Sequence, residues 1–211
     1  MSCRSLHRRL SDVTLTPLKA LVCALALSGL SCGGAFAADG AGRFSVRGIG
    51  AKSCADYSAA LADRAAVSSY ASWLMGYASA RNRDGTRTFD ILPTQQGLDL
   101  VNIVAAICKG RQAMVVESAA NEAVALFGPM RQEMETPLVR FEVGGKSVSI
   151  RQGALVSLQR ALIDKEFFRG PADGAPGRPF AEALRSFQKA EGIAVTGLPD
   201  MDSFIRAILK R

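Results

Sequence analysis

The sequence predicts a mainly α-helical protein: a disulfide-linked helical domain, then a short β-hairpin, then a three-helix module. Apolar residues recur at helical spacing through most of residues 51–128 and 151–211. Residues 140–150 instead alternate apolar and polar residues around a Gly-Gly pair, which predicts the hairpin. The expected boundaries are 1–37 for a signal peptide, 38–50 for an N-terminal linker, 51–128 for the helical domain, 129–150 for the connector with the hairpin, and 151–211 for the C-terminal module.

The first 37 residues have the pattern of a secretory signal peptide. Basic residues precede an apolar run over residues 20–30, and Ala35-Phe36-Ala37 offers small residues for cleavage. The run is shorter than the roughly 20 residues that cross a bilayer. We therefore expect a periplasmic or secreted mature chain without a membrane span. A retained anchor is one alternative; lipidation at Cys32 is another, although no large aliphatic residue stands three positions before it.

The charge of the mature chain is modest. Removal of residues 1–37 leaves 22 basic and 18 acidic residues, without a dense Lys/Arg tract. Nucleic-acid binders carry a much stronger basic footprint, so we expect no nucleic-acid partner. A weak positive charge suits an acidic wall polymer, and it suits solubility equally well.

Histidine is absent after the leader, because the only one is His7. Cys-His peptidases, L,D-transpeptidases, Ser-His hydrolases and His-ligated zinc amidases all need an imidazole as base or ligand. We therefore expect no enzyme of these classes, no metal and no cofactor. A muramidase relying on carboxylates stays as the alternative, with Glu117, Glu122 and Asp90 as its candidates, although solvated helix faces explain these acids better.

Cys54 and Cys108 are the only cysteines after the leader. An even pair in an oxidising compartment predicts a disulfide. Closing the long loop between them would stabilise the fold by about 4 kcal/mol in the chain-entropy model. A catalytic thiol is the alternative, but no histidine follows the leader to serve as its basic partner.

Three helices are expected in the N-terminal domain. The first runs within residues 54–80 and ends at Asp84-Gly85, the second covers Leu98 to Cys108, and the third covers residues 114–127. The second is apolar nearly all round and should be central. The residues expected to face inward are Tyr70, Trp73, Leu74 and Tyr77 in the first helix and Val115, Ala119, Ala123 and Leu126 in the third. The second helix has two apolar faces, one with Leu98, Val101, Val104 and Cys108 and the other with Leu100, Ile103 and Ile107. An exposed aromatic stripe on the first helix, able to stack on sugar rings or a partner, is the alternative to core packing.

Three further helices are expected in the C-terminal module. Residues 153–165 form the first and residues 169–179, rich in glycine and proline, form a long turn. The second helix ends at Gly192, and Asp200 or Asp202 caps the third. The apolar positions are Leu155, Leu158, Leu162, Phe180, Ala183, Leu184, Phe187, Phe204, Ile205, Ile208 and Leu209.

A train of short motifs runs through this module. Its members, in order, are Leu158-Gln159, Phe168, Gly170, Asp173-Gly174, Gly177, Phe187-Gln188, Gly192 and Thr196-Gly197. The train resembles the small peptidoglycan-binding module of bacterial cell-wall proteins, over about residues 148–209. The resemblance implies a three-helix fold with a shallow glycan or peptide groove beside the Asp-Gly turn. The contacts it suggests are Phe168, Asp173, Arg178 and Gln188.

Two positions depart from the family pattern. Phe180 replaces a threonine that we expect to cap the second helix, and Ser203 replaces one that we expect to cap the third. A serine can cap a helix, but a phenylalanine cannot. The start of the second helix and the groove edge beside it are therefore the parts of the site where this chain should differ from the family.

The N-terminal domain has a weaker resemblance. The pattern formed by Cys54, Tyr57, the segment 73–77, Asn82 and Cys108 resembles that of small periplasmic helical proteins with one disulfide, such as acid-stress chaperones and type VI immunity proteins.

From the two resemblances together, we expect a secreted envelope protein that binds peptidoglycan without cleaving it. Its N-terminal domain would be a partner-binding or chaperone-like domain presented to an envelope protein. A wall hydrolase or its accessory subunit is one alternative, and an immunity or stress protein located at the wall is another.

Overall fold

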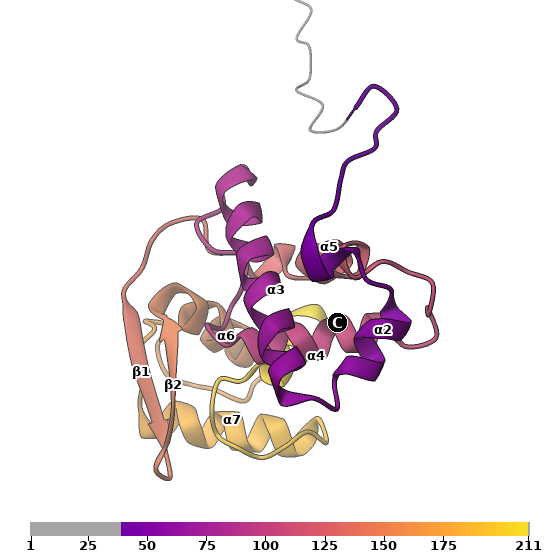
Figure 1. Ribbon diagram of the computed structural model, residues 1–211. Helices are drawn as coiled ribbons and strands as arrows, with labels where there is room; N and C mark the ends of the chain where they lie inside the picture. Colours follow the sequence, from indigo (N-terminus) through magenta and orange to yellow (C-terminus); the bar gives the residue numbers. More distant parts are fainter. Residues whose placement is uncertain (1–38, 211) are drawn as a thin grey trace, which may run out of the picture. The chain divides into compact units, whose positions relative to one another are not determined.

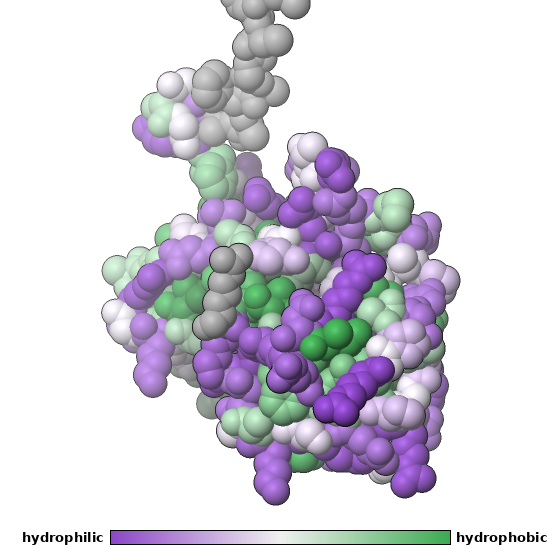
Figure 2. Space-filling view, turned by 180° about the vertical axis from the view of Figure 1, so that it is seen from behind, coloured by the Kyte–Doolittle hydropathy of each residue, from purple (hydrophilic) through white to green (hydrophobic). Residues whose placement is uncertain are grey.

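The computed structural model describes residues 39–210 (Figure 1; Figure 2 gives the view from behind). The predicted signal peptide, with His7 and Cys32, lies outside the described residues. Residues up to Ser45 belong to a separate unit, where the Asp39 carboxylate accepts hydrogen bonds from the backbone of Ala41 and Arg43. Within the described part of the chain, no helix is long and apolar enough to cross a membrane.

The N-terminal half is helical, as predicted. Its elements are η1 (Gly48–Ala51), α2 (Cys54–Ala60), α3 (Arg64–Asp84), α4 (Gly97–Cys108), α5 (Val116–Leu126) and η2 (Gly128–Met130). Helix α4 contacts α2, α3 and α5, which confirms its central position (Figure 1). The single first helix expected within residues 54–80 is wrong. The helix ends after α2 and a second helix, α3, begins after Asp63, because the Asp63 side chain caps α3 by accepting a hydrogen bond from Ala65 N.

Some of the expected inward faces are rotated. Leu98 is 55% exposed, although Val101, Val104 and Cys108 are buried as predicted. Val115 and Leu126 are also exposed in place of the predicted burial. Val115 precedes the first residue of α5 and pairs with Ser53 in a β-bridge, so its direction follows the extended backbone and not the helix. Val116 and Val124 fill the core beside Ala119 and Ala123.

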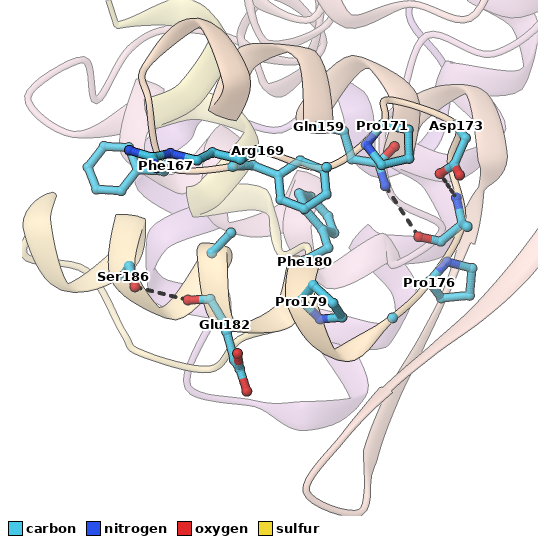
Figure 3. A pocket seen from close by; sticks show the side chains of 15 residues that line it. Gln159, Phe167, Arg169, Pro171, Asp173, Pro176, Pro179, Phe180, Glu182 and Ser186 are labelled. Carbon is cyan, nitrogen blue, oxygen red and sulfur yellow. Dashed lines mark hydrogen bonds between the residues drawn. The ribbon is translucent and has the colours of Figure 1, made fainter.

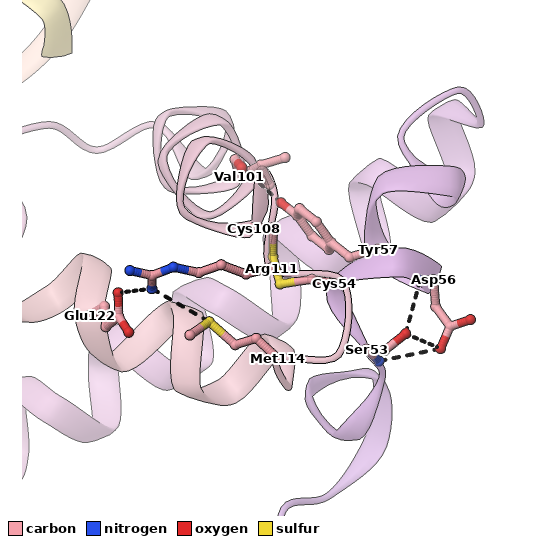
Figure 4. Close-up of a disulfide and its surroundings, with 9 residues drawn as sticks. All are labelled: Ser53, Cys54, Asp56, Tyr57, Val101, Cys108, Arg111, Met114 and Glu122. Carbon is pink, nitrogen blue, oxygen red and sulfur yellow. Dashed lines mark hydrogen bonds and ion pairs between the residues drawn. A yellow bond between two sulfur atoms is a disulfide. The ribbon is translucent and has the colours of Figure 1, made fainter.

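The predicted disulfide joins Cys54, the first residue of α2, to Cys108, the last residue of α4 (Figure 4). Both cysteines are fully buried. Beside them the hydroxyl of Tyr57, also buried, donates a hydrogen bond of 2.8 Å to the carbonyl oxygen of Val101. A covalent bond and a buried hydrogen bond therefore fix α2 on α4.

The aromatic stripe of α3 divides between core and surface. Tyr70 is buried and packs edge-on against Tyr57, with ring centroids 4.6 Å apart. Trp73 and Tyr77 are half-buried and stack on each other at 5.5 Å. The indole N–H of Trp73 donates to the carbonyl oxygen of Arg47, 3.1 Å away. The outer part of the stripe thus holds the segment that leads into α2.

The predicted hairpin is present. Strands β1 (Leu138–Val143) and β2 (Lys146–Arg151) pair antiparallel around Gly144-Gly145. The two strands each bury one large side chain, Phe141 and Ile150. The Phe141 ring meets the Phe180 ring edge-on at 6.0 Å, so the hairpin packs on the C-terminal module.

The module has the helices that its sequence predicts: α6 (Gln152–Asp164), α7 (Arg178–Ala190) and α8 (Met201–Phe204), which continues as the π-helical turn η3 (Ile205–Leu209). The apolar positions predicted for α6 and α7 are buried, and Gly192 follows α7 in the left-handed conformation. One hydrophobic core extends from Cys54 to Ala207. The separation into independently folding domains at residues 128 and 151 stays a prediction.

Candidate functional site

A buried glutamine on α6 holds the turn that follows it. Gln159 accepts a hydrogen bond of 2.7 Å from the backbone N–H of Gly174 and donates one of 3.2 Å to the carbonyl oxygen of Ala175. Gly174 has φ +71°, a conformation that side-chain-bearing residues rarely adopt. The Gln159 side-chain amide therefore pairs with one backbone N–H and one backbone carbonyl of a turn that only glycine makes easily. We call this arrangement the first clamp.

A second glutamine on α7 repeats the geometry. Gln188 accepts a 2.7 Å hydrogen bond from Gly197 N and donates a 3.0 Å bond to the carbonyl oxygen of Leu198. Gly197 has φ +69°, almost the same as Gly174. In this second clamp the Gln188 amide nitrogen also lies within hydrogen-bonding distance of side-chain oxygens of Thr196, Asp200 and Ser203. The two Leu-Gln and Phe-Gln pairs of the sequence are thus two copies of one device.

Each clamped turn leads into a helix at the same distance. The residue three positions after the glycine is the N-cap: Gly177 for α7 and Asp200 for α8. Phe180 and Ser203 therefore both stand at the third helical position, so the expectation that these positions are caps is wrong. Phe180 points into the core, and the buried Ser203 hydroxyl donates to the Asp200 carboxylate.

A surface groove of about 650 Å³ lies between the first clamped turn and α7 (Figure 3). Its floor includes Phe168 and Phe180, whose rings meet edge-on at 5.1 Å. Its sides are largely apolar, and polar groups stand at its edges. Other residues that line it include Phe167, Pro171, Pro176, Gly177 and Pro179, with Arg169, Asp173, Glu182 and Ser186 among the polar ones.

The four contacts predicted from sequence lie in three different places. Phe168 and Asp173 line the groove. Asp173 is exposed, and its carboxylate accepts a 2.8 Å hydrogen bond from Ala175 N within its own turn. Arg178 is exposed just outside the groove, where it pairs with Glu182 at 2.9 Å. Gln188 is fully buried and its amide is occupied by the second clamp, so this structure gives it no surface for a ligand.

Sequence reasoning missed several groove residues. It treated residues 169–179 as a turn and assigned no contact to Arg169 or to the three prolines. Prolines in a long ordered turn were the available signal, because their rigid apolar rings suit a ligand surface. Glu182 and Ser186 reach the groove because they lie one helical turn apart on α7, on the face that also carries Ala183.

The acids of the muramidase alternative are scattered. Glu117 accepts a hydrogen bond of 3.0 Å from the Tyr77 hydroxyl, whose pKa is raised to about 12 by burial and by the Glu117 charge. Glu122 forms an ion pair with Arg111. Asp90 is buried and is held by several partners, among them Arg151 at 3.3 Å. None of the three lines the groove beside α7.

Comparison with known protein families places the groove in a recognised sequence pattern. Residues 151–203 match the family model described as "Putative peptidoglycan binding domain". The matched stretch includes both clamps and all the groove residues, and it confirms the resemblance of the C-terminal module. The match does not extend to the N-terminal helices, and it gives no support to their resemblance to periplasmic chaperones and immunity proteins. Neither the comparison with curated proteins nor the comparison with solved structures gave a match.

Proposed function

We propose that this chain is a secreted cell-envelope protein that binds peptidoglycan, without cleaving it, in the groove beside α7. One observation carries the proposal: all the residues that line the groove lie within the stretch that matches the peptidoglycan-binding family model. The match supports peptidoglycan binding, and the groove is the binding place that we propose.

The groove suits a glycan strand or its attached peptide. Sugar rings and peptide methyl groups have apolar faces that can lie on prolines and phenylalanine edges, and their hydroxyl and amide groups can meet polar side chains at the edges. The first clamp fixes the turn that forms one wall. A wall that is ordered before binding loses little conformational entropy when the ligand arrives.

Phe168, Asp173 and Arg178 remain proposed contacts, and Arg169, Glu182 and Ser186 join them. Gln188 was predicted as a fourth contact. Its burial favours a supporting role, in which it holds the turn after α7.

Non-catalytic binding follows from the residues available in the mature chain. No histidine follows the leader, and the two cysteines after the leader are bonded to each other. Hydrolysis needs a poised acid or base beside the bound substrate. The acids that line the groove, Asp173 and Glu182, are exposed, whereas the acid of a muramidase lies in an apolar cleft. A hydrolase or accessory role relying on the carboxylates of Glu117, Glu122 or Asp90 is the second candidate.

The helical N-terminal half is proposed to act as a partner-binding or chaperone-like region held at the wall. The disulfide supports a periplasmic or extracellular location, because such bonds persist in oxidising compartments. An immunity or stress role at the wall would fit the same arrangement.

Sedimentation with purified sacculi tests the proposal on the chain from residue 38 onward. Wild-type protein should sediment with the sacculi, and Ser186→Trp, which fills the groove from α7, should stay largely in solution. Ser79→Trp is the matched control, because Ser79 is exposed on α3 and its hydroxyl bonds the carbonyl oxygen four residues earlier, as that of Ser186 does.

Equal sedimentation of Ser186→Trp and wild type would remove the groove from the proposal, and no sedimentation of wild type would refute wall binding. Incubation with labelled sacculi should release no soluble fragments above buffer. Release that disappears in Glu117→Gln or Glu122→Gln would favour the hydrolase alternative.

A further inference from the structure

A second groove, of about 470 Å³, lies beside the first, between the hairpin and α7. The hairpin contributes the stretch from Arg140 to Gly144, which lies outside the residues that match the family model. One side of the second groove therefore lies outside the matched stretch, and the other side lies within it. The residues that matter for its chemistry are Arg140, Glu142, Pro176, Gly177, Arg178 and Arg185.

The charges around the second groove are mostly positive. Three arginines line it against one acid, Glu142. Arg140 pairs with Glu142 at 3.2 Å and Arg178 with Glu182 at 2.9 Å, but all four side chains are more than half exposed, so these pairs are weak. Arg185 forms no ion pair with any residue between 39 and 210. The arginines are thus available to an anionic ligand.

The start of α7 adds to this positive field. The N-cap, Gly177, has no side chain to accept from the N–H groups of the first turn, and no acid stands in that turn. The positive end of the helix dipole is therefore open toward the groove that Gly177 lines. The cap of α8 is different, because the Asp200 carboxylate accepts from Ser203 N at 3.0 Å.

The two grooves meet at Pro176 and Gly177, which line both. A ligand lying on the apolar floor of the first groove can continue over this edge toward the arginines. Peptidoglycan has the matching chemistry, because its glycan carries short peptides with free carboxylates. Arginine binds carboxylates through two parallel N–H donors, which gives direction as well as charge.

We propose that the second groove binds carboxylate groups of the wall peptides while the first groove holds the adjoining part of the same strand. This inference rests on the proposed wall binding and deepens it. It assigns Arg140, Arg178 and Arg185 as the residues that select acidic peptides. Glu142 opposes the ligand charge from the same groove and so limits the affinity.

The test compares intact sacculi with sacculi whose carboxylates have been amidated. Wild-type protein should bind intact sacculi about fivefold more tightly than amidated ones, as expected for loss of an exposed charged contact. Arg140→Gln should bind intact sacculi about fivefold more weakly than wild type does. It should bind amidated sacculi as tightly as wild type does. Glu142→Gln should bind intact sacculi about twofold more tightly, because it removes a competing negative charge.

Arg160→Gln is the control, because Arg160 is an exposed cation on α6 that lines neither groove. It separates the second groove from the general positive charge of the chain and should bind like wild type. Thermal unfolding of each variant checks that the fold is intact; Arg140 lies on the exposed hairpin, so its replacement should leave the unfolding temperature unchanged.

The outcomes separate the two proposals. Wild-type binding that ignores amidation, or equal behaviour of Arg140→Gln and Arg160→Gln, overturns the carboxylate groove and leaves wall binding standing. Absence of wild-type binding overturns both. Arg140-dependent binding to phosphatidylglycerol vesicles, together with indifference to amidation, would assign the second groove to phosphate and so overturn the carboxylate assignment.

Discussion

The two clamped turns share one geometry and have opposite surroundings. Around Gly174 the chain is exposed on both sides and forms the wall of the first groove. Around Gly197 the chain is covered, with Leu198 and Pro199 buried, and the Gln188 amide nitrogen lies near four oxygen atoms where that of Gln159 has one. The same local device thus borders a surface groove in one copy and contributes to the packing of the fold in the other.

The two turns differ in the N-cap residue of the helix that follows, which is Gly177 for α7 and Asp200 for α8. Asp200 accepts hydrogen bonds from the Thr196 and Ser203 hydroxyls and closes the second turn onto α8. Gly177 has no side chain and leaves the first turn and the start of α7 open. The groove edge stays open because Gly177 has no capping side chain. Replacements in the two clamps and at Gly177 should therefore affect stability and binding separately.

The largest expected effect is on the second clamp. Gln188→Ala should lower the free energy of unfolding by about 3 kcal/mol, because it leaves Gly197 N and several buried oxygens without their partner. Gln159→Ala should cost about 1.5 kcal/mol, since its amide makes fewer bonds. Urea unfolding measures both. Equal losses would show that the extra bonds of the second clamp contribute nothing.

The two turn glycines should differ next. A Cβ at Gly174 would lie 2.7 Å from the backbone oxygen of Gln152, which cannot move easily, whereas one at Gly197 would meet the Arg185 side chain at 3.0 Å. Both replacements carry the cost of positive φ, about 1 kcal/mol. Gly174→Ala should therefore cost about 2 to 3 kcal/mol and Gly197→Ala about 1 kcal/mol. Thermal unfolding distinguishes the two, and a larger loss at Gly197 would contradict the assignment.

The stability of the protein should also depend on pH through Asp99 on α4, close to Asp200 of the second turn. Burial and the negative charges of Asp200 and Asp202 raise the pKa of Asp99, and the hydrogen bond from Thr94 only partly offsets this rise. A raised pKa in the folded state favours folding at low pH, and this stability is lost as the pH rises through that pKa.

Asp99→Asn should therefore unfold at a higher temperature than wild type at pH 7, and the difference should shrink toward pH 3. A series of melting temperatures over this range measures it. A difference that is independent of pH would show that the Asp99 charge is not the cause.

The smallest effect is expected at the open start of α7. Gly177→Ser and Gly177→Asp should each add a few tenths of a kcal/mol, because either side chain can cap the helix from the extended conformation of this residue. Only the aspartate should weaken sedimentation with sacculi, since it brings a negative charge to the edge between the two grooves. Equal binding by the two variants would argue against an anionic ligand at this edge.

The sequence predicted those features that neighbouring residues encode. The periodicity of α4, α6 and α7, the Gly-Gly turn of the hairpin and the pair of cysteines each needed only a local pattern, and each is confirmed. The break between α2 and α3 was missed, because an alanine-rich stretch is equally compatible with one helix and the decision depends on the Asp63 cap. Burial of one face was misjudged at Leu98 and Leu126, where the neighbouring elements decide which side is covered.

The groove was predictable only in part. Phe168 and Asp173 line it as expected, because the turn that carries them is marked by glycine and proline. Gln188 was placed among the contacts because it was expected to lie in or beside the turn at the groove. Its side chain instead bonds a turn nine residues later, and that relation needs the third dimension. The second groove combines the hairpin with α7, which no local pattern brings together.

The packing of Phe141 against Phe180 limits how freely the module could be transplanted. A segment limited to the matched residues 151–203 would leave out the hairpin and expose the Phe180 ring at the start of α7. The same segment would end before η3, whose Ala207 is buried in the shared core. Fusions that use this module as a wall tag should therefore begin no later than Leu138 and run through Lys210. We therefore expect the exchangeable unit of this protein to be longer than the stretch that matches the family model.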